Sequence, residues 1–142
     1  MIFWLSALEL DVSNIIMKSL IIDAATKKIY LVLINNKNIY TCSYENSKSN
    51  FDRLVILIED FLNSNKSQIN EIEEIYVNRG PGSFAGIRSS LSIVKGYYLT
   101  RKIDYYCYST QDFIGEKDIK YENIPYLCEK FKIEKNLINP IY

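Results

Sequence analysis

The residues best suited to bind a ligand lie in one glycine-rich segment, residues 79–88. A tight turn that leads into a helix presents backbone amides, and these amides can hold an anion together with nearby guanidinium groups. The candidate contacts for an anion are Arg79, Gly80, Pro81, Gly82, Ser83, Gly86 and Arg88. The alternative is that the segment is only a turn, because glycine tolerates positive φ and proline presets φ.

This segment matches neither of the common phosphate-binding motifs. A Walker A loop needs a lysine and then a serine or threonine after its last glycine, whereas Gly86 is followed by Ile87 and Arg88. The dinucleotide fingerprint GxGxxG needs its third glycine one residue before Gly86. The sequence therefore predicts no nucleotide site of either kind at this turn.

Asp23 is the second candidate, because it ends an apolar run, residues 19–22, that predicts a buried strand. The residues after it, Ala24, Ala25 and Thr26, include no glycine, so their backbone cannot easily wrap a phosphate. Asp23 can coordinate a cation through water or cap the turn together with Thr26. We favour the cap.

The chain has 142 residues and no histidine. This absence excludes histidine metal ligands, Ser-His-Asp and Cys-His nucleophile pairs and imidazole bases. The three cysteines, Cys42, Cys107 and Cys128, form no CxxC pattern and predict free thiols in a reducing compartment. Seventeen basic and seventeen acidic residues cancel, whereas an autonomous nucleic-acid binder normally has a basic excess. We therefore expect no metal site and no catalytic residue.

The elements around the glycine-rich segment are a strand before it and a helix after it. An apolar run ending at Val77 predicts the strand, and Ser83 is a plausible N-cap for the helix. The core face of this helix is predicted to contain Phe84, Ile87, Leu91, Val94 and Tyr98.

A stripe of small residues, Ala85, Ser89, Ser92 and Gly96, follows a second face of the same helix. Small side chains let another helix approach closely. That helix can belong to the same domain or to another protein, and the spacing alone leaves both alternatives open.

A second helix is predicted to begin at Ser49 or Asn50, either of which can serve as its N-cap. Its expected core stripe is Phe51, Leu54, Val55, Ile58, Phe61 and Leu62. Ile56 and Leu57 then fall on the opposite face, where a surface helix should be polar, and this favours a partner. The residues expected at a partner interface are Leu54, Leu57, Ile58, Ala85, Ser89, Ser92, Ile93 and Gly96.

The remaining strands predict an α/β fold. Residues 19–23, 29–34 and 39–44 form an antiparallel meander, with a hairpin at residues 35–38. Residues 104–108 form a further strand, which is reached through the helix and is therefore parallel to the strand before it.

Residues 78–88, Asn-Arg-Gly-Pro-Gly-Ser-Phe-Ala-Gly-Ile-Arg, resemble the GRGPGSFTGVR signature of the TsaB (YeaZ) family, with Asn78 for glycine and Ala85 for threonine. Residues 22–26 resemble the family's IDTAT, and residues 139–142 its terminal Pro-x-Tyr strand. The resemblance implies a ribonuclease-H-like lobe of the actin/Hsp70 type (ASKHA). This is a mixed sheet with a three-stranded antiparallel meander followed by βαβ units, with the second lobe mostly missing.

The resemblance also divides the chain. We expect residues 1–16 to be an extension before a natural start at Met17, with a partner-binding or membrane-touching helix as the alternative. Residues 17–110 correspond to the ribonuclease-H-like lobe of the family. Residues 111–142 are expected to be a reduced remnant of the second lobe and a tail, with a short helix near residues 126–131.

By the same resemblance, the chain is a cytoplasmic, non-catalytic subunit that pairs with TsaD through a helical interface. TsaD transfers the threonylcarbamoyl group to the tRNA adenosine beside the anticodon. ATP or ADP and the metal are expected to bind to TsaD. TsaE is expected as the third partner, and tRNA is expected to bind only to the whole complex. No membrane contact is expected.

Two other functions stay open. One is a small actin-like phosphotransferase or hydrolase that uses Asp23 and residues 80–86. The other is a solitary homodimer, because the same helical faces can pair with themselves. Binding of TsaD would favour the scaffold, and hydrolysis by the chain alone would favour the enzyme.

Overall fold

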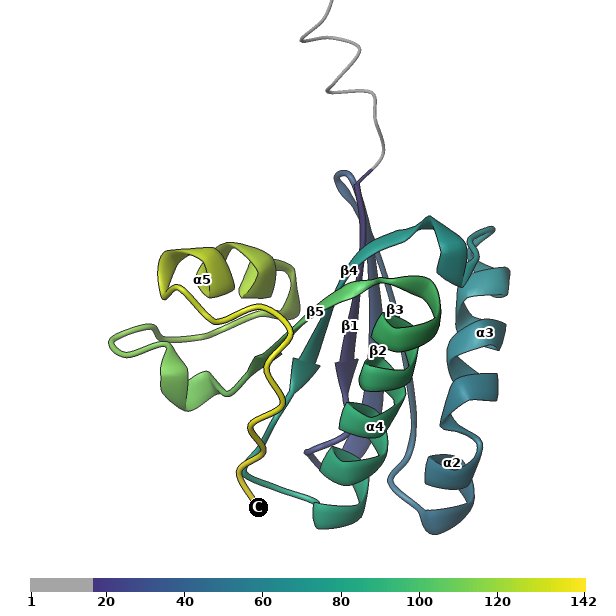
Figure 1. Ribbon diagram of the computed structural model, residues 1–142, viewed down its shortest axis with the longest axis horizontal. Coiled ribbons are helices and arrows are strands. Elements are labelled where there is room, and N and C mark those ends of the chain that lie inside the picture. The colour runs from purple at the N-terminus through teal and green to yellow at the C-terminus, as the bar shows by residue number, and fades with distance from the viewer. Residues whose placement is uncertain (1–16) are drawn as a thin grey trace, which may run out of the picture.

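The computed structural model describes residues 17–142, which form one five-stranded sheet with helices on both faces (Figure 1). The strand order is β3-β2-β1-β4-β5. The strands are β1 (Lys18–Asp23), β2 (Lys28–Asn35), β3 (Asn38–Glu45), β4 (Ile72–Asn78) and β5 (Asp104–Tyr108). The antiparallel pairing of β1 with β2 and β2 with β3, and the parallel pairing of β1 with β4 and β4 with β5, confirm the predicted mixed sheet.

The first face of the sheet is covered by three helices, α2 (Lys48–Asp52), α3 (Leu54–Ser64) and α4 (Phe84–Arg101). Alternate residues of β1 and β4, such as Leu20 and Ile75, point to this face because side chains alternate along a strand. They form a core with the buried side of α3 and α4, including Ile58, Leu91 and Val94.

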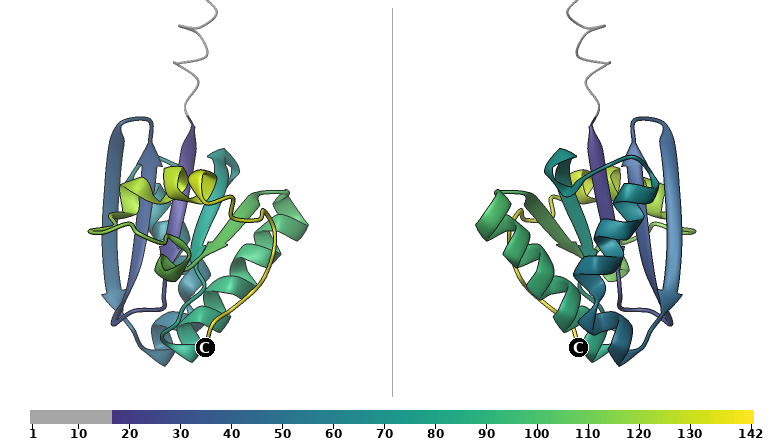
Figure 2. Two further views of the ribbon diagram at one scale, coloured as in Figure 1. Left: turned by 90° about the vertical axis from the view of Figure 1, so that its left-hand side faces the viewer. Right: turned by 90° about the vertical axis from the view of Figure 1, so that its right-hand side faces the viewer.

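The second face is covered by the last part of the chain, which Figure 2 shows crossing the sheet opposite α3 and α4. Its helical elements are η2 (Thr110–Asp112), η3 (Tyr121–Asn123) and α5 (Ile124–Lys130). Ile21, Val32 and Tyr76 of the sheet pack here with Phe113 and Leu127. Residues beyond 110 therefore complete the core of the same sheet.

The C-terminal tail returns along the edge of β5. The backbone amide of Asn136 donates to the carbonyl of Tyr105 at 2.8 Å, and that of Ile141 donates to the carbonyl of Arg79 at 2.7 Å. The ring of Tyr142 lies 4.6 Å, centroid to centroid, from that of Phe84. The short helix and the extended final segment that the sequence indicated are both present.

The predicted helix after the meander is wrong in its start and its continuity. Ser47 is the N-cap, accepting from the amide of Asn50 at 3.2 Å, and the helix breaks at Arg53. After the break, α3 buries Leu54, Leu57, Ile58, Phe61 and Leu62, the spacing of one helical face. Val55 is exposed and Leu57 is buried, the reverse of the prediction, because the break changes which residues of α3 continue the stripe that begins at Phe51.

Cys107 and Cys128 are buried, Cys42 is half-buried, and all three thiols are free, as predicted. Burial raises the pKa of both Cys107 and Cys128 to about 12, so these thiols stay protonated at neutral pH. None of the helices in residues 17–142 combines the length and the apolar character needed to cross a membrane. The prediction for residues 1–16 lies outside the described residues.

Candidate functional site

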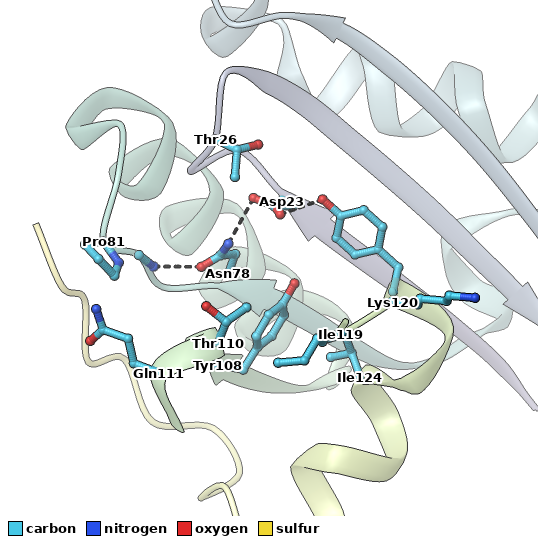
Figure 3. Close-up of a pocket in the computed structure, with 12 residues that line it drawn as sticks. Asp23, Thr26, Asn78, Pro81, Tyr108, Thr110, Gln111, Ile119, Lys120 and Ile124 are labelled. Carbon is cyan, nitrogen blue, oxygen red and sulfur yellow. Dashed lines mark hydrogen bonds between the residues drawn. The ribbon is translucent and has the colours of Figure 1, made fainter. Parts of the chain in front are cut away.

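Asn78 connects the end of β1 to the start of the glycine-rich turn (Figure 3). Its side-chain nitrogen donates to Oδ1 of Asp23 at 3.1 Å, and its side-chain oxygen accepts from the amide of Gly80 at 2.9 Å. Because β1 and β4 are parallel neighbours, their carboxyl ends meet at one edge of the sheet. The two segments that the sequence singled out are therefore adjacent.

Asp23 caps its own turn, but not with Thr26. Oδ1 also accepts from the amide of Ala25 at 3.1 Å, and Oδ2 accepts from the hydroxyl of Tyr121 at 2.7 Å. The hydroxyl of Thr26 instead donates to the carbonyl of Lys28 at 3.2 Å, so this part of the prediction is wrong. Sequence reasoning missed Tyr121, because it lies 98 residues further along the chain and no local pattern links the two residues.

Two glycines of the turn allow it to lie directly against the end of β1. A Cβ on Gly82 would stand 2.0 Å from the carbonyl oxygen of Ala25, and one on Gly86 would stand 1.9 Å from that of Ala24. The amide of Ser83 donates to the carbonyl of Ala25 at 2.8 Å. The glycines of the signature thus serve close backbone packing inside the chain.

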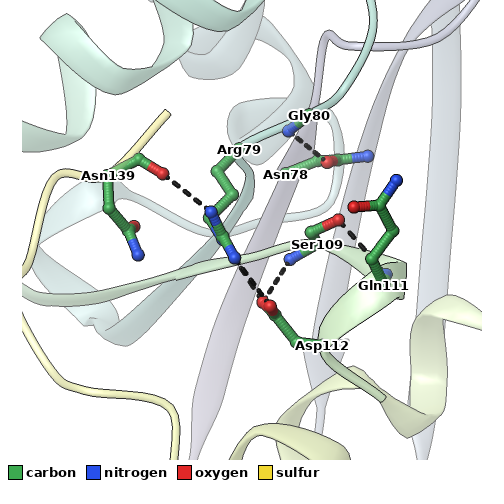
Figure 4. Close-up of polar contacts among 7 residues, drawn as sticks. All are labelled: Asn78, Arg79, Gly80, Ser109, Gln111, Asp112 and Asn139. Atoms are coloured by element: carbon green, nitrogen blue, oxygen red, sulfur yellow. Dashed lines mark hydrogen bonds and ion pairs between the residues drawn. The ribbon is translucent and has the colours of Figure 1, made fainter. Parts of the chain in front are cut away.

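Arg79 holds the tail and the segment after β5 together (Figure 4). Its Nη2 lies 2.6 Å from Oδ1 of Asp112, its Nε donates to Oδ2 of the same residue at 3.3 Å, and its Nη1 donates to the carbonyl of Asn139 at 3.0 Å. Gly80, at φ +107°, gives room to the tail, because a Cβ there would stand 2.0 Å from the carbonyl oxygen of Ile141. Arg79 therefore fixes the fold.

These contacts occupy several of the groups that the sequence offered for an anion, and the anion site stays a prediction. The amide of Gly86 donates to the side-chain oxygen of Ser83 at 3.1 Å, which confirms Ser83 as the N-cap of α4. The amide of Gly80 and the guanidinium of Arg79 are likewise used within the chain. Arg88 is exposed and lies near α2 instead. Pro81 and Gly80 line a cavity that Asp23 and Asn78 also line.

The small stripe on α4 is packed internally at one end and open at the other. At the first end, the hydroxyl of Ser89 donates to the carbonyl of Phe51 at 3.2 Å, which ties α4 to α2. At the second end, a Cβ on Gly96 would meet nothing within 4 Å, and Leu99, one step further along the stripe, is 66% exposed. The structure therefore shows packing within the domain for part of the stripe, because α2 covers only that part, and the contact with another protein stays a prediction.

A groove of about 320 Å³ lies between α2 and the first turns of α4. Phe84, which is exposed, and Ala85 line one side, and Phe51 lines the other. Ser92 is exposed further along the helix, and Ile93 is half-buried against the core. The predicted core position of Phe84 is therefore wrong, because the helix has only just left the turn at that residue and its ring meets the tail instead.

The structure also corrects the interface residues predicted on α3. Leu54 and Ile58 are fully buried and Leu57 is 5% exposed, so none of the three can contact a partner while the domain is folded. The exposed apolar side chains of α3 are Val55 at 40% and Ile56 at 50%. In residues 17–142, no group of three or more Cys, Asp or Glu side chains has a metal-binding arrangement.

Comparison with known proteins agrees with this architecture. The family model described as "TsaD: tRNA N6-adenosine threonylcarbamoyltransferase" matches residues 44–128, more than half of the chain. The solved structure of YeaZ from Pseudomonas aeruginosa superposes with a TM-score of 0.60 at 20% identity, covering 66% of this chain and 44% of that one. This likeness shows the ribonuclease-H-like, actin-type fold.

Curated relatives are similar in sequence. The tRNA threonylcarbamoyladenosine biosynthesis protein TsaB of Buchnera aphidicola (Acyrthosiphon pisum strain) is 25% identical over 108 residues, which are 76% of this chain and 48% of that protein. The protein of the same name from Escherichia coli K12 is 30% identical over 87 residues, 58% of this chain and 36% of that protein. The chain thus spans about half, or less, of the length of the curated relatives that it matches.

Proposed function

Since this chain belongs to the TsaB (YeaZ) family, within the wider family that the TsaD model describes, we propose that it serves the synthesis of threonylcarbamoyladenosine on tRNA. In this role it is a non-catalytic subunit that pairs with TsaD through its helical layer. TsaD holds the nucleotide and the metal, and TsaE joins the complex as the ATPase. The chain contacts tRNA only as part of this complex, which works in the cytoplasm.

The observation that carries this proposal is the open half of the α4 stripe. Ser92, Gly96 and Leu99 follow one another at spacings of one helical turn, and α2 does not cover them. A helix surface of small residues ended by an exposed leucine suits the close approach of a second helix, because the small side chains leave room and the leucine offers apolar contact. A partner helix that lies along α4 can cover both features together.

The exposed apolar side chains of α3 are the second part of the proposed interface. Val55 and Ile56 lie on the helical layer that covers the first face of the sheet, as does α4. We therefore place the interface on Val55, Ile56, Ala85, Ser92, Gly96 and Leu99, and leave out the buried leucines and isoleucine of α3. Ser89 and Ile93 support this surface from below, because each is partly covered by its own domain.

The proposal that the chain is not itself catalytic rests on which reactive side chains it has and on what those side chains already bind. The sequence contains no histidine, and the carboxylate of Asp23 already accepts from three groups of its own chain. The guanidinium of Arg79 is committed to Asp112 and Asn139. The groups that would have to act on a phosphate or a carbonyl are thus engaged in holding the fold.

The experiment is co-expression of this chain with TsaD of the same genome, followed by size-exclusion chromatography with light scattering. The proposal predicts a complex of one chain of each kind. If this chain instead elutes as a stable homodimer whether TsaD is present or not, the heterodimeric role is wrong and the self-paired alternative replaces it.

A further inference from the structure

A cavity of about 350 Å³ opens at the carboxyl edge of the sheet (Figure 3). Asp23, Asn78 and Tyr108 are the last residues of β1, β4 and β5, and all three line it. These strands are parallel neighbours, and ligands of open α/β sheets bind in the crevice beyond the carboxyl ends of such strands. The cavity is also large enough for one small ring.

Tyr108 presents an unused polar group to this cavity. Its side chain is 1% exposed, yet its hydroxyl has no hydrogen-bond partner within the described part of the chain. Figure 3 shows this hydroxyl directed towards Asp23. Burial, with the nearby Asp23 carboxylate as a smaller cause, raises the pKa of Tyr108 well above its ordinary value, so the hydroxyl keeps its proton. It can therefore donate one hydrogen bond and also accept.

Asp23 supplies the complementary acceptor. Its Oδ1 accepts from Ala25 and Asn78, while its Oδ2 accepts only from the hydroxyl of Tyr121. A carboxylate oxygen has two acceptor sites, so Oδ2 can take one more donor. A group placed between Asp23 and Tyr108 must therefore donate to the first and accept from the second, as a hydroxyl does.

The charge and the walls of the cavity narrow the choice of ligand. Asp23 is a carboxylate, and Lys120, the one lysine that lines the cavity, extends away from it in Figure 3. A phosphate would meet this carboxylate without a cation to compensate. Ile119, Ile124 and the ring of Tyr121 offer apolar surface, and Thr110 and Gln111 add polar groups near the mouth.

We propose that this cavity binds a neutral polyhydroxylated ring, either a free monosaccharide or the ribose of a nucleoside. One ring hydroxyl donates to Oδ2 of Asp23 and accepts from the hydroxyl of Tyr108. The apolar face of the ring packs on Tyr121 and Ile124. This site is on the opposite side of the sheet edge from the α3 and α4 surface, and it does not depend on pairing with TsaD.

The test is titration of the full chain, followed by NMR, with D-ribose, D-glucose, uridine, 2′,3′-dideoxyuridine and uridine monophosphate. The proposal predicts saturable binding of a sugar or of uridine. Binding of D-ribose or D-glucose would identify the ligand of the cavity as a free monosaccharide. Binding of uridine alone, with at least a tenfold loss for the dideoxy compound, assigns a nucleoside. Tighter binding of the monophosphate than of uridine would overturn the charge argument.

The matched variants are Tyr108→Phe and Tyr97→Phe, since Tyr97 is the other buried tyrosine whose hydroxyl lacks a partner in the described residues. Tyr97 lies on α4, against the other core. Tyr108→Phe should weaken binding about tenfold without lowering the melting temperature, and Tyr97→Phe should leave binding unchanged. If no probe binds the wild type, or if both variants bind alike, the cavity holds ordered water only and the proposal fails.

Discussion

Arg79 and Asp112 form a two-point ion pair, with 2.6 Å between Nη2 and Oδ1 and 3.3 Å between Nε and Oδ2. The pair joins the start of the glycine-rich turn to the segment that follows β5. The same guanidinium reaches the carbonyl of Asn139 in the tail. One side chain therefore holds three chain segments that are far apart in the sequence.

We predict that Asp112→Asn lowers the free energy of unfolding by about 2 kcal/mol, because it removes the charge that compensates a largely buried guanidinium. Urea denaturation of the purified chain measures this change. Glu122→Gln is the control, since Glu122 is exposed in η3. A loss below about 0.5 kcal/mol, no larger than ordinary surface substitutions give, would show that the pair does not stabilise the fold.

The two glycines of α4, Gly86 and Gly96, should respond in opposite ways to alanine. Gly86→Ala places a Cβ 1.9 Å from the carbonyl oxygen of Ala24 and should cost about 3 kcal/mol or more. Gly96→Ala meets nothing within 4 Å and should stabilise α4 by about 0.5–1 kcal/mol. Thermal unfolding of both variants measures the contrast, and equal effects would refute the packing role of Gly86.

Alkaline pH should destabilise the domain through its buried thiols. Because the pKa of Cys107 and of Cys128 is about 12 in the folded chain and near the ordinary thiol value in the unfolded chain, their stabilising effect is complete below about pH 8.5. As pH rises from about 8.5 towards 12, the free energy of unfolding falls by up to about 1.4 kcal/mol per pH unit for each thiol.

Urea midpoints at pH 8, 9 and 10 measure this slope; between pH 8 and 9 the thiols dominate it, and buried tyrosines with raised pKa values add to the fall towards pH 10. The Cys107→Ala/Cys128→Ala variant should be less stable at pH 8 but show a flatter slope. A wild-type midpoint that does not fall between pH 9 and 10 would contradict the assigned shifts.

Much of this structure follows from local sequence pattern. Alternation and apolar runs predict all five strands, and the Ser83 cap and the periodicity after it predict α4. Such features depend on residues close together in the chain. The pattern failed at Arg53, where a break between two short helices moved Val55 to the surface and Leu57 into the core.

The contacts that define the site could not be predicted in the same way. Tyr121 meets Asp23 across 98 residues, and Arg79 meets Asp112 across 33. Each pairing depends on how residues beyond 110 cross the second face of the sheet. No spacing in the sequence encodes that crossing, so Arg79 looked like a free cation until its partners were visible.

Gly96→Leu tests whether TsaD binds to the open half of α4. Leucine is a better helix former than glycine, and a Cβ at this position would meet nothing within 4 Å, so the monomer should become more stable. The matched control is Ser43→Trp, at an exposed position of β3 that faces away from α3 and α4.

Binding of TsaD to the three chains is compared by isothermal titration calorimetry, with melting temperatures measured in parallel. We expect Gly96→Leu to raise the melting temperature while weakening TsaD binding at least a hundredfold, and we expect Ser43→Trp to bind TsaD like the wild type. If Gly96→Leu binds TsaD as tightly as the wild type does, the α4 surface is not the interface.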